Sequence, residues 1–237
     1  MTYPLGLYAS AIDESDYVAK VAPLVRELVP DRGTLMDIGA GGGQMGAALR
    51  MQGQDWTAIE PAPVMQQRLR ALHAPPNLVP HGWRDAGEVA PADTVFAATM
   101  PAYLTDTQDF FRQCRAWARR QIIWIVPAQN GPRGLILSAC LPREWHREDE
   151  TPGIDLVLPA LEANPPHHMR VQDWTFSLTL KDLPFFASWQ ADRLGWAADD
   201  SRRAELFAHL KLKGIATSDG VRLSCPRRSA ILVWNLP

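Results

Sequence analysis

A short apolar run that ends in an acid and then breaks into glycines constrains the fold of this chain more than any other feature. Residues 34–46 read TLMDIGAGGGQMG, so Asp37 precedes glycines at positions 39, 41 and 43 in the spacing D-x-G-x-G-x-G. The apolar residues fit a buried strand, and glycine ends it because its backbone adopts positive φ and carries no side chain. Apolar residues then recur at helical spacing as far as Gly53. The pattern predicts a strand, a glycine loop and a helix, where a ligand can lie directly on the backbone.

A second acid follows one strand later. The segment DWTAIEP predicts another short strand that ends in Glu60, roughly 20 residues past the glycines. A carboxylate in that place can accept hydrogen bonds from both hydroxyl groups of a ribose. The expected ligand is therefore an adenosine derivative at the carboxyl edge of a parallel sheet.

The two acids and the loop resemble those of the class I S-adenosylmethionine-dependent methyltransferases, in which the same spacing ends the first strand and an acid ends the second. The resemblance implies a methyltransferase of the small-molecule type, with S-adenosylmethionine as cofactor. In that family the residues after the third strand flank the adenine, and those after the fourth face the sulfonium group. The cofactor contacts implied for this chain are Asp37, Gly39, Ala40, Gly41, Gly43, Glu60, Pro61, Trp83, Arg84, Thr99 and Met100. Trp83 could stack on the base or simply cover the surface.

Two other interpretations stay open. Gly41, Gly43 and Gly46 also spell G-x-G-x-x-G, the dinucleotide fingerprint, so an NAD(P)-dependent or flavin oxidoreductase is one alternative. The acid before the first glycine favours the methyltransferase, because the dinucleotide fingerprint does not need it. The other alternative is a noncatalytic module that binds the cofactor or a partner without turnover.

The alternation of strand and helix patterns predicts an α/β fold with a doubly wound, mostly parallel sheet. The resemblance implies a Rossmann-like sheet of seven strands in a single domain over residues 1–237. Pro80 places the third strand at the edge, because proline cannot donate to a sheet ladder. A C-terminal β-hairpin is expected from strands at 220–224 and 229–234, separated by Cys225-Pro226-Arg227-Arg228.

The alternation changes character beyond Pro127, and residues 128–182 are expected to form an insertion that acts as a lid over the methyl group. The insertion carries His146, a candidate general base because the unperturbed pKa of histidine lies near neutrality. Tyr103, after the fourth strand, is a second catalytic candidate. The pattern identifies no base, so the acceptor, the atom that is methylated and the need for a base stay open.

Composition limits the partners. A net charge of −2 gives no global attraction to nucleic acid or membrane, and the arginine pairs, Arg227–Arg228 among them, are interpreted as solvated ends of elements. Asn164-Pro165-Pro166 resembles the N-P-P-[YF] motif of amino-group methyltransferases, but His167 replaces the aromatic residue and the triplet is interpreted as a turn. Three scattered cysteines suggest neither a disulfide framework nor a metal site. We expect a cytoplasmic protein with a small-molecule methyl acceptor, and its oligomeric state stays open.

Overall fold

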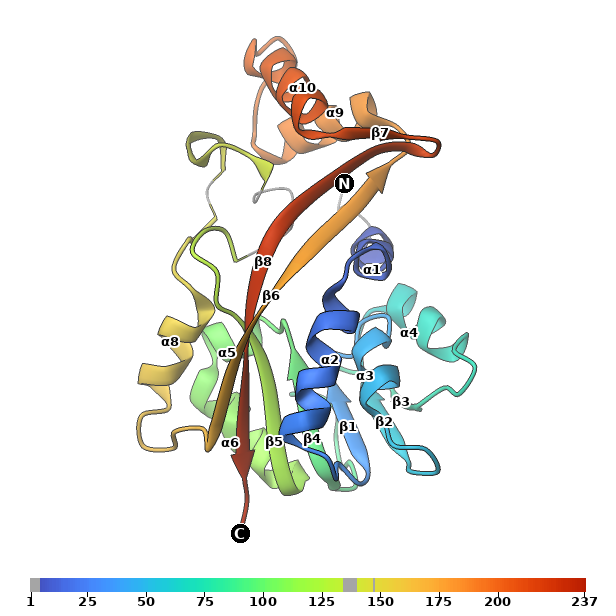
Figure 1. Ribbon diagram of the computed structural model, residues 1–237, viewed down its shortest axis with the longest axis vertical. Coiled ribbons are helices and arrows are strands. Elements are labelled where there is room, and N and C mark those ends of the chain that lie inside the picture. Colours follow the sequence, from blue (N-terminus) through green and yellow to red (C-terminus); the bar gives the residue numbers. More distant parts are fainter. Residues whose placement is uncertain (1–4, 134–139, 147) are drawn as a thin grey trace.

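The computed structural model describes residues 5–133, 140–146 and 148–237, which form one mixed sheet flanked by helices (Figure 1). The strand order is β3-β2-β1-β4-β5-β8-β6, and β7 pairs with β8 outside this path. The strands are β1 Leu35–Ile38, β2 Trp56–Ile59, β3 Asn77–Val79, β4 Ala92–Ala98, β5 Ala118–Pro127, β6 His168–Leu180, β7 Ile215–Thr217 and β8 Gly220–Asn235. β1 to β5 pair in parallel, whereas β8 is antiparallel to β5 and β6. The mostly parallel sheet and the edge position of β3 are confirmed, and β7 brings the strands to eight.

Helices cover both faces of the sheet. They are α1 Leu5–Glu14, α2 Tyr17–Leu28, α3 Gln44–Leu49, α4 Pro63–Arg70, α5 Ala102–Thr105, α6 Thr107–Trp117, α8 Gly153–Ala160, α9 Leu183–Arg193 and α10 Arg202–Lys213, with a 3-10 turn η1 at Arg143–Trp145. Side chains of α2 and α3 share a buried cluster with Leu35 and Phe96, whereas those of α6 and α8 share the other cluster with Met36 and Val95. Neighbouring residues of a strand point to opposite faces, so strands covered on both faces are apolar throughout.

Aromatic rings fill the core on the α6 face. The indole of Trp124 in β5 is fully buried and stacks on Phe110 with ring centroids 5.2 Å apart. Trp234 of β8 meets the same indole edge-on at 5.2 Å. Phe110 and Phe111 lie in α6 with Cys114 and Trp117 at helical spacing, and all of them are buried. The amphipathic pattern of this helix therefore determines which of its faces lies on the sheet.

β8 is one continuous strand, and the hairpin break expected at positions 225–228 is wrong. β8 pairs with β5 only as far as the Pro127↔Ser229 pair, but with β6 along its whole length to Val221. Pro226 lies between the parts of β8 that pair with β7 and with β5, where one edge of the strand lacks a partner and proline is tolerated. A C-terminal hairpin is nevertheless present, because β7 and β8 pair across the turn that ends at Gly220.

The ribbon of β6 and β8 rises beyond the carboxyl ends of the parallel strands (Figure 1). Its far end is capped by α9, α10 and β7 (Figure 1), and Phe186 of α9, Leu206 of α10 and Leu223 of β8 belong to the same buried cluster as the side chains of α2. α1, which the sequence did not predict, packs on β6 above the carboxyl edge of the sheet. β6 lies within the expected insertion, and the division of the chain into one domain with a lid stays a prediction.

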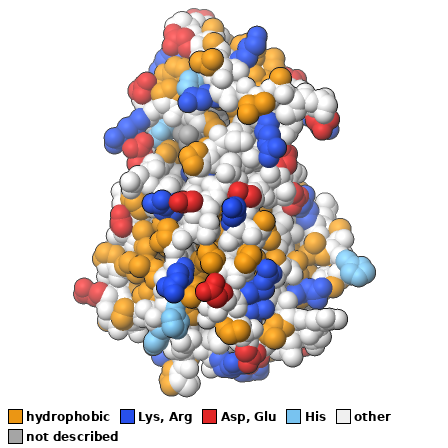
Figure 2. All heavy atoms as spheres, viewed as in Figure 1, with side chains coloured by type: hydrophobic (Ala, Val, Ile, Leu, Met, Phe, Trp, Pro, Cys, Tyr) orange, Lys and Arg blue, Asp and Glu red, His pale blue; other side chains and the backbone are white. Residues whose placement is uncertain are grey.

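The surface mixes charges of both signs. Lys and Arg side chains are interspersed with Asp and Glu side chains over the face seen in Figure 2, in line with the net charge of −2. In the described ranges, no helix has both the length and the apolar character that a membrane crossing needs.

Gly46 tests how closely α3 packs on the sheet. A Cβ added at this position would overlap the ring of Trp56 and the carboxylate of Asp37. We expect Gly46→Ala to lower the free energy of unfolding by about 1–3 kcal/mol, because overpacking outweighs the helix propensity gained, ~1 kcal/mol. Urea denaturation measures the effect. Gly82→Ala is the control, since its Cβ would meet only Asp85 at 3.8 Å, and equal stability of the two variants would contradict the packing argument.

Candidate functional site

The glycine loop follows β1 through backbone conformations that favour glycine. Gly39, Gly41 and Gly43 have φ values of +67°, +56° and +83°. The N–H groups of Gly39 and Ala40 both donate to the carbonyl oxygen of Ile59, over 2.8 and 3.3 Å. A Cβ on Gly41 would meet no atom within 4 Å. The loop therefore presents bare backbone to open space at the carboxyl ends of β1 and β2.

The carboxylate of Glu60 lies directly beside this loop. It is buried at the end of β2, where one oxygen accepts the Gly41 N–H over 2.8 Å and the other accepts the Ala62 N–H over 2.8 Å. An ionised carboxylate offers about four acceptor positions, so two remain for a ligand. The neighbouring carbonyl groups of Glu60 and Pro61 accept from Gln66 Nε2 over 2.9 and 3.2 Å, which holds this turn in place.

Asp37 lies underneath the loop and is almost completely buried. Its Oδ2 has no hydrogen-bond partner among the described residues. Burial raises the pKa of this carboxyl to about 8, and the nearby charge of Glu60 adds to the shift. A cationic ligand in the adjacent cavity would compensate for this buried group.

Met100 covers part of the loop. Its sulfur lies where a Cβ of Gly39 would point, so the thioether rests on the glycine backbone. A ligand that lies on Gly39 needs another Met100 rotamer, which is accessible because methionine has three flexible side-chain bonds.

A strained turn follows β4. Thr99 has a φ of +53° and is the one non-glycine residue with positive φ in the part of the chain that the structure describes. The hydroxyl of Tyr103 fixes this turn, because it accepts the Met100 N–H over 2.6 Å and donates to the carbonyl oxygen of Ile125 over 2.6 Å. Strain of this kind persists only where its surroundings enforce it and is concentrated at functional sites.

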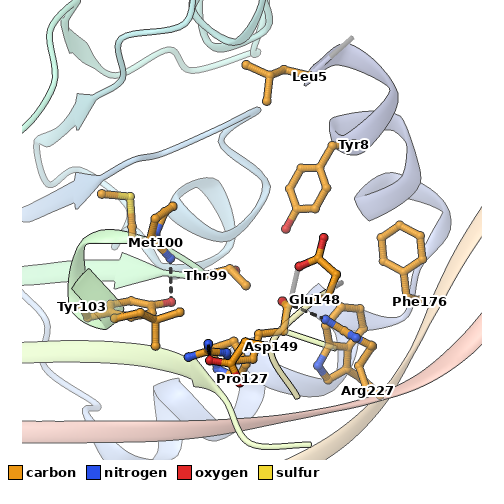
Figure 3. Close-up of a pocket in the computed structure, with 14 residues that line it drawn as sticks. Leu5, Tyr8, Thr99, Met100, Tyr103, Pro127, Glu148, Asp149, Phe176 and Arg227 are labelled. Carbon is orange, nitrogen blue, oxygen red and sulfur yellow. Dashed lines mark hydrogen bonds and ion pairs between the residues drawn. The ribbon is translucent and has the colours of Figure 1, made fainter. Parts of the chain in front are cut away.

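Two cavities meet at this turn. The smaller, of about 140 Å³, lies over the glycine loop and includes Asp37, Gly39, Ala40 and Gly41 in its lining. The larger, of about 480 Å³, lies between α1, the ends of β4 and β5, and the β6–β8 ribbon (Figure 3). The residues that line both are Tyr8, Thr99 and Met100. A ligand on the glycine loop and a ligand in the larger cavity would therefore approach each other at the turn after β4.

α1 forms the cover of the smaller cavity. Gln44 Nε2, at the start of α3, donates to the Ala9 carbonyl over 3.0 Å and to Asp13 over 2.7 Å. Asp13 also forms an ion pair with Arg68 of α4. These contacts tie α1 across the loop, so a ligand as large as a nucleoside enters the smaller cavity only if α1 moves.

The lining of the larger cavity combines apolar and charged side chains. Leu104, Trp174 and Phe176 are among the apolar residues that line it. The charged residues are Arg133, Glu148, Asp149 and Arg227.

Arg227 corrects the sequence interpretation of a solvated arginine. Its side chain is 8% exposed, and it donates to the carbonyl oxygens of Pro132 and Arg133 over 2.8 and 3.2 Å. Burial lowers its pKa, whereas the negative groups around it oppose the shift. Its neighbour Arg228 is exposed and pairs with Asp173, as expected of a surface residue.

The structure places the two catalytic candidates in different surroundings. The hydroxyl of Tyr103 lies in the wall, but both of its hydrogen bonds hold the turn after β4, and burial raises its pKa well above the usual range. His146 lines a separate cavity next to α9, with Nε2 3.6 Å from Glu150. Neither placement gives these residues a base's position, so we assign neither a catalytic role.

Trp83 and Arg84 lie beside the sheet rather than facing the loop cavity. The Trp83 ring packs edge-on against Phe110 at 5.1 Å, and the Arg84 guanidinium lies 4.2 Å from its centre. Arg84 also forms an ion pair with Asp106 over 2.8 Å. The geometry favours the surface-covering role of Trp83, and its contact with a cofactor stays a prediction.

Arg227 was not predicted to line the cavity, for an identifiable reason. Once β8 is read as continuous, the period of two places Leu223, Cys225, Arg227 and Ser229 on the same buried face. Glu148 carried no comparable signal, because the segment around it follows no regular period.

Asp37 gives a testable link between pH and stability. In the unfolded chain its carboxyl ionises near 3.8, whereas in the fold its pKa is about 8. Between these values the unfolded chain releases a proton that the folded protein keeps, so this group's contribution to stability falls as pH rises. We expect Asp37→Asn, which mimics the protonated acid, to exceed the wild type in urea unfolding by only about 1 kcal/mol at pH 4.5 and by several times that at pH 8. Asp55→Asn is the control, because Asp55 is exposed. If the difference in unfolding free energy between Asp37→Asn and the wild type did not change with pH, the assignment would be contradicted.

Comparison with known proteins places the fold. No family model matches the sequence, and no curated protein matches it either. A candidate methyltransferase from Bacillus halodurans C-125 superposes with a TM-score of 0.56 at 11% identity, over 92% of this chain and 99% of that one. A candidate type II methyltransferase from Anaeromyxobacter dehalogenans gives 0.55 at 17% identity, over 91% and 96%. The plantazolicin methyltransferase in complex with SAH gives 0.50 at 11% identity, over 98% and 90%. The protein therefore has the Rossmann-like fold of the S-adenosylmethionine-dependent methyltransferases.

Proposed function

We propose that this protein transfers a methyl group from S-adenosylmethionine to a small molecule. The observation that carries the proposal is the meeting of two cavities at Tyr8, Thr99 and Met100. One cavity lies on the glycine loop and the other under the β6–β8 ribbon, as a transfer between two bound molecules requires. The fold shared with methyltransferases supports the same conclusion.

The residues around the loop fit this cofactor chemically. Glu60 has free acceptor positions for ribose hydroxyls, Gly41 leaves the backbone uncovered, and Gly39 is covered only by the flexible Met100, whereas Gly43 packs against Leu69 and Leu72. Asp37 is a buried carboxyl without a partner on Oδ2, which suits a ligand that carries positive charge. Pro61 belongs to the turn that positions Glu60.

Bound there, the cofactor would supply an electrophilic methyl group on a sulfonium. The residues of the chain then act mainly by placement, because a near-attack geometry accounts for roughly 7–11 kcal/mol of such a barrier in favourable cases. Thr99 and Met100 would hold the transferable group at the junction, and α1 would exclude water from it.

The larger cavity supports a small-molecule acceptor. Its volume of about 480 Å³ lies within the range of ligand pockets, roughly 300–1,000 Å³. Walls from α1, the β4 and β5 ends and the ribbon surround it (Figure 3). Such a site suits a compact molecule better than an extended nucleic-acid strand.

The alternatives are less well supported. A dinucleotide enzyme more often ends on another parallel strand, whereas β8 is antiparallel and lies between β5 and β6. A noncatalytic module would not need a second cavity beside the loop. Calorimetric titration with the cofactors distinguishes a methyltransferase from a dinucleotide enzyme, and a measurement of turnover distinguishes either from a noncatalytic module.

The cofactor is tested by isothermal titration calorimetry of the full chain. We expect S-adenosylmethionine and S-adenosylhomocysteine to bind with a stoichiometry near one, and NADH to give no heat beyond dilution. A bound cation also favours ionised Asp37, so the affinity for S-adenosylmethionine should fall as pH drops below about 8, and the fall should be absent in Asp37→Asn. Tight binding of NADH alone would end the methyltransferase proposal.

The role of Glu60 is tested by Glu60→Ala. Loss of a charged acceptor for the ribose should weaken S-adenosylhomocysteine binding by about 1.5–3 kcal/mol, or roughly 10- to 150-fold in Kd. Glu88→Ala is the control, because Glu88 is exposed in the segment between β3 and β4. An unchanged Kd in Glu60→Ala, with an unchanged melting temperature, would remove Glu60 from the site.

A further inference from the structure

Most ionisable groups that line the larger cavity are committed to other bonds. The hydroxyl of Tyr103 is bonded on both sides. Burial raises the pKa of the Tyr8 phenol, with the Thr99 hydroxyl and Arg227 opposing the shift, so this group stays protonated at neutral pH. Arg133 forms an ion pair with Asp149, and Arg227 donates to two backbone carbonyls.

Glu148 is the exception. It is half-buried and lines the cavity, and among the described residues its carboxylate has no hydrogen bond and no ion pair, although its charge acts on Arg227 from a longer distance. In Figure 3 the carboxylate points toward the hydroxyl of Tyr8, one of the residues at the junction of the two cavities. The site therefore holds one carboxylate that is free to accept a proton or a hydrogen bond from a ligand.

The other candidates for a base are less suitable. The pKa of Asp149 is lowered by hydrogen bonds from Thr151 and by the charge of Arg133, which makes Asp149 a poorer proton acceptor. Its side chain is also 57% exposed, so water reaches it more easily than the half-buried Glu148. His146, two residues before Glu148, faces Glu150 in the neighbouring cavity.

The rest of the lining indicates what kind of molecule fits. The guanidinium groups of Arg133 and Arg227 balance the carboxylates of Glu148 and Asp149, so the formal charges of the wall cancel. The lining also includes the ring of Phe176 and the indole of Trp174, which pairs with Arg227 across β6 and β8 and whose Nε1 is already bonded to Ser229 Oγ over 3.0 Å. Such surfaces favour a flat apolar body without net charge.

We propose that Glu148 is the proton acceptor of the methyl transfer, and that the acceptor is a small, uncharged aromatic molecule bearing a hydroxyl or amino group. The inference rests on the proposed function. In the step, a lone pair of the acceptor oxygen or nitrogen forms a bond to the methyl carbon. The carbon–sulfur bond breaks with its electron pair going to sulfur, and the proton of the acceptor passes to the carboxylate of Glu148.

The binding test uses the full chain saturated with S-adenosylhomocysteine and a matched pair of probes, 2-naphthol and 2-methylnaphthalene, in which a methyl replaces the hydroxyl. Equilibrium dialysis should show at least a tenfold preference for 2-naphthol, since a hydrogen bond to a charged acceptor contributes that much. In Glu148→Leu the preference should fall below threefold. Glu144→Leu, an exposed glutamate of the same segment outside this cavity, is the control and should keep it.

The transfer test uses S-adenosylmethionine with 2-naphthol or 6-aminoquinoline, and mass spectrometry detects the methylated product. Glu148→Gln should slow product formation at least a hundredfold, as expected for a general base, while the Kd of S-adenosylhomocysteine and the melting temperature stay unchanged. Glu144→Gln should react at the wild-type rate. Equal rates for Glu148→Gln and wild type, or no product from either probe with the wild type, would overturn the role of Glu148.

The outcomes separate this inference from the proposed function. Absence of binding by S-adenosylmethionine and S-adenosylhomocysteine would overturn both. Two outcomes would overturn only the acceptor class and the role of Glu148. In the first, the cofactor binds but 2-naphthol does not. In the second, Glu148→Leu keeps the preference for 2-naphthol over 2-methylnaphthalene.

Discussion

The pairing of β8 with two different strands is the constraint on which the rest of the structure depends. Its second half pairs with β5 and extends the parallel sheet, and its pairing with β6 continues from there to Val221, above the carboxyl ends of the other strands. A single strand thus links the buried sheet to the ribbon that carries Trp174, Phe176 and Arg227. Without that continuity the carboxyl edge of the sheet would face solvent, and the larger cavity would have no far wall.

The electrostatics of the site reflect the same enclosure. Two carboxyl groups, Asp37 and Glu60, are buried close enough at the glycine loop for their charges to interact, and their mutual repulsion and burial raise the pKa of Asp37. In the larger cavity Arg133 pairs with Asp149, and the charge of Arg227, which donates to two carbonyl oxygens, is opposed by that of Glu148. The smaller cavity therefore favours positive charge, whereas the larger has no net preference. This difference suits a cationic donor beside an uncharged acceptor.

Local patterns predicted the elements whose environment is uniform. The run before Asp37, the segment that ends in Glu60 and the proline at position 80 each indicated one element, and the structure contains β1, β2 and the edge strand β3, which ends just before Pro80. The patterns failed where one element crosses two environments. Proline and two arginines inside β8 resemble a turn, but a ribbon with one unpaired edge accepts them. α1 was missed because its apolar residues contact β6, a partner distant in the sequence.

The sequence by itself determined the strand, loop and helix around Asp37 and the second acid at Glu60, because glycine and strand-end chemistry are local properties of the chain. Tertiary structure alone decided which side chains share the larger cavity. Tyr8, Thr99, Glu148 and Arg227 come from four separate segments, and only the folding of α1 and the ribbon over the sheet brings them together. Spacing along the chain carries no information about such contacts, since they depend on how whole elements pack.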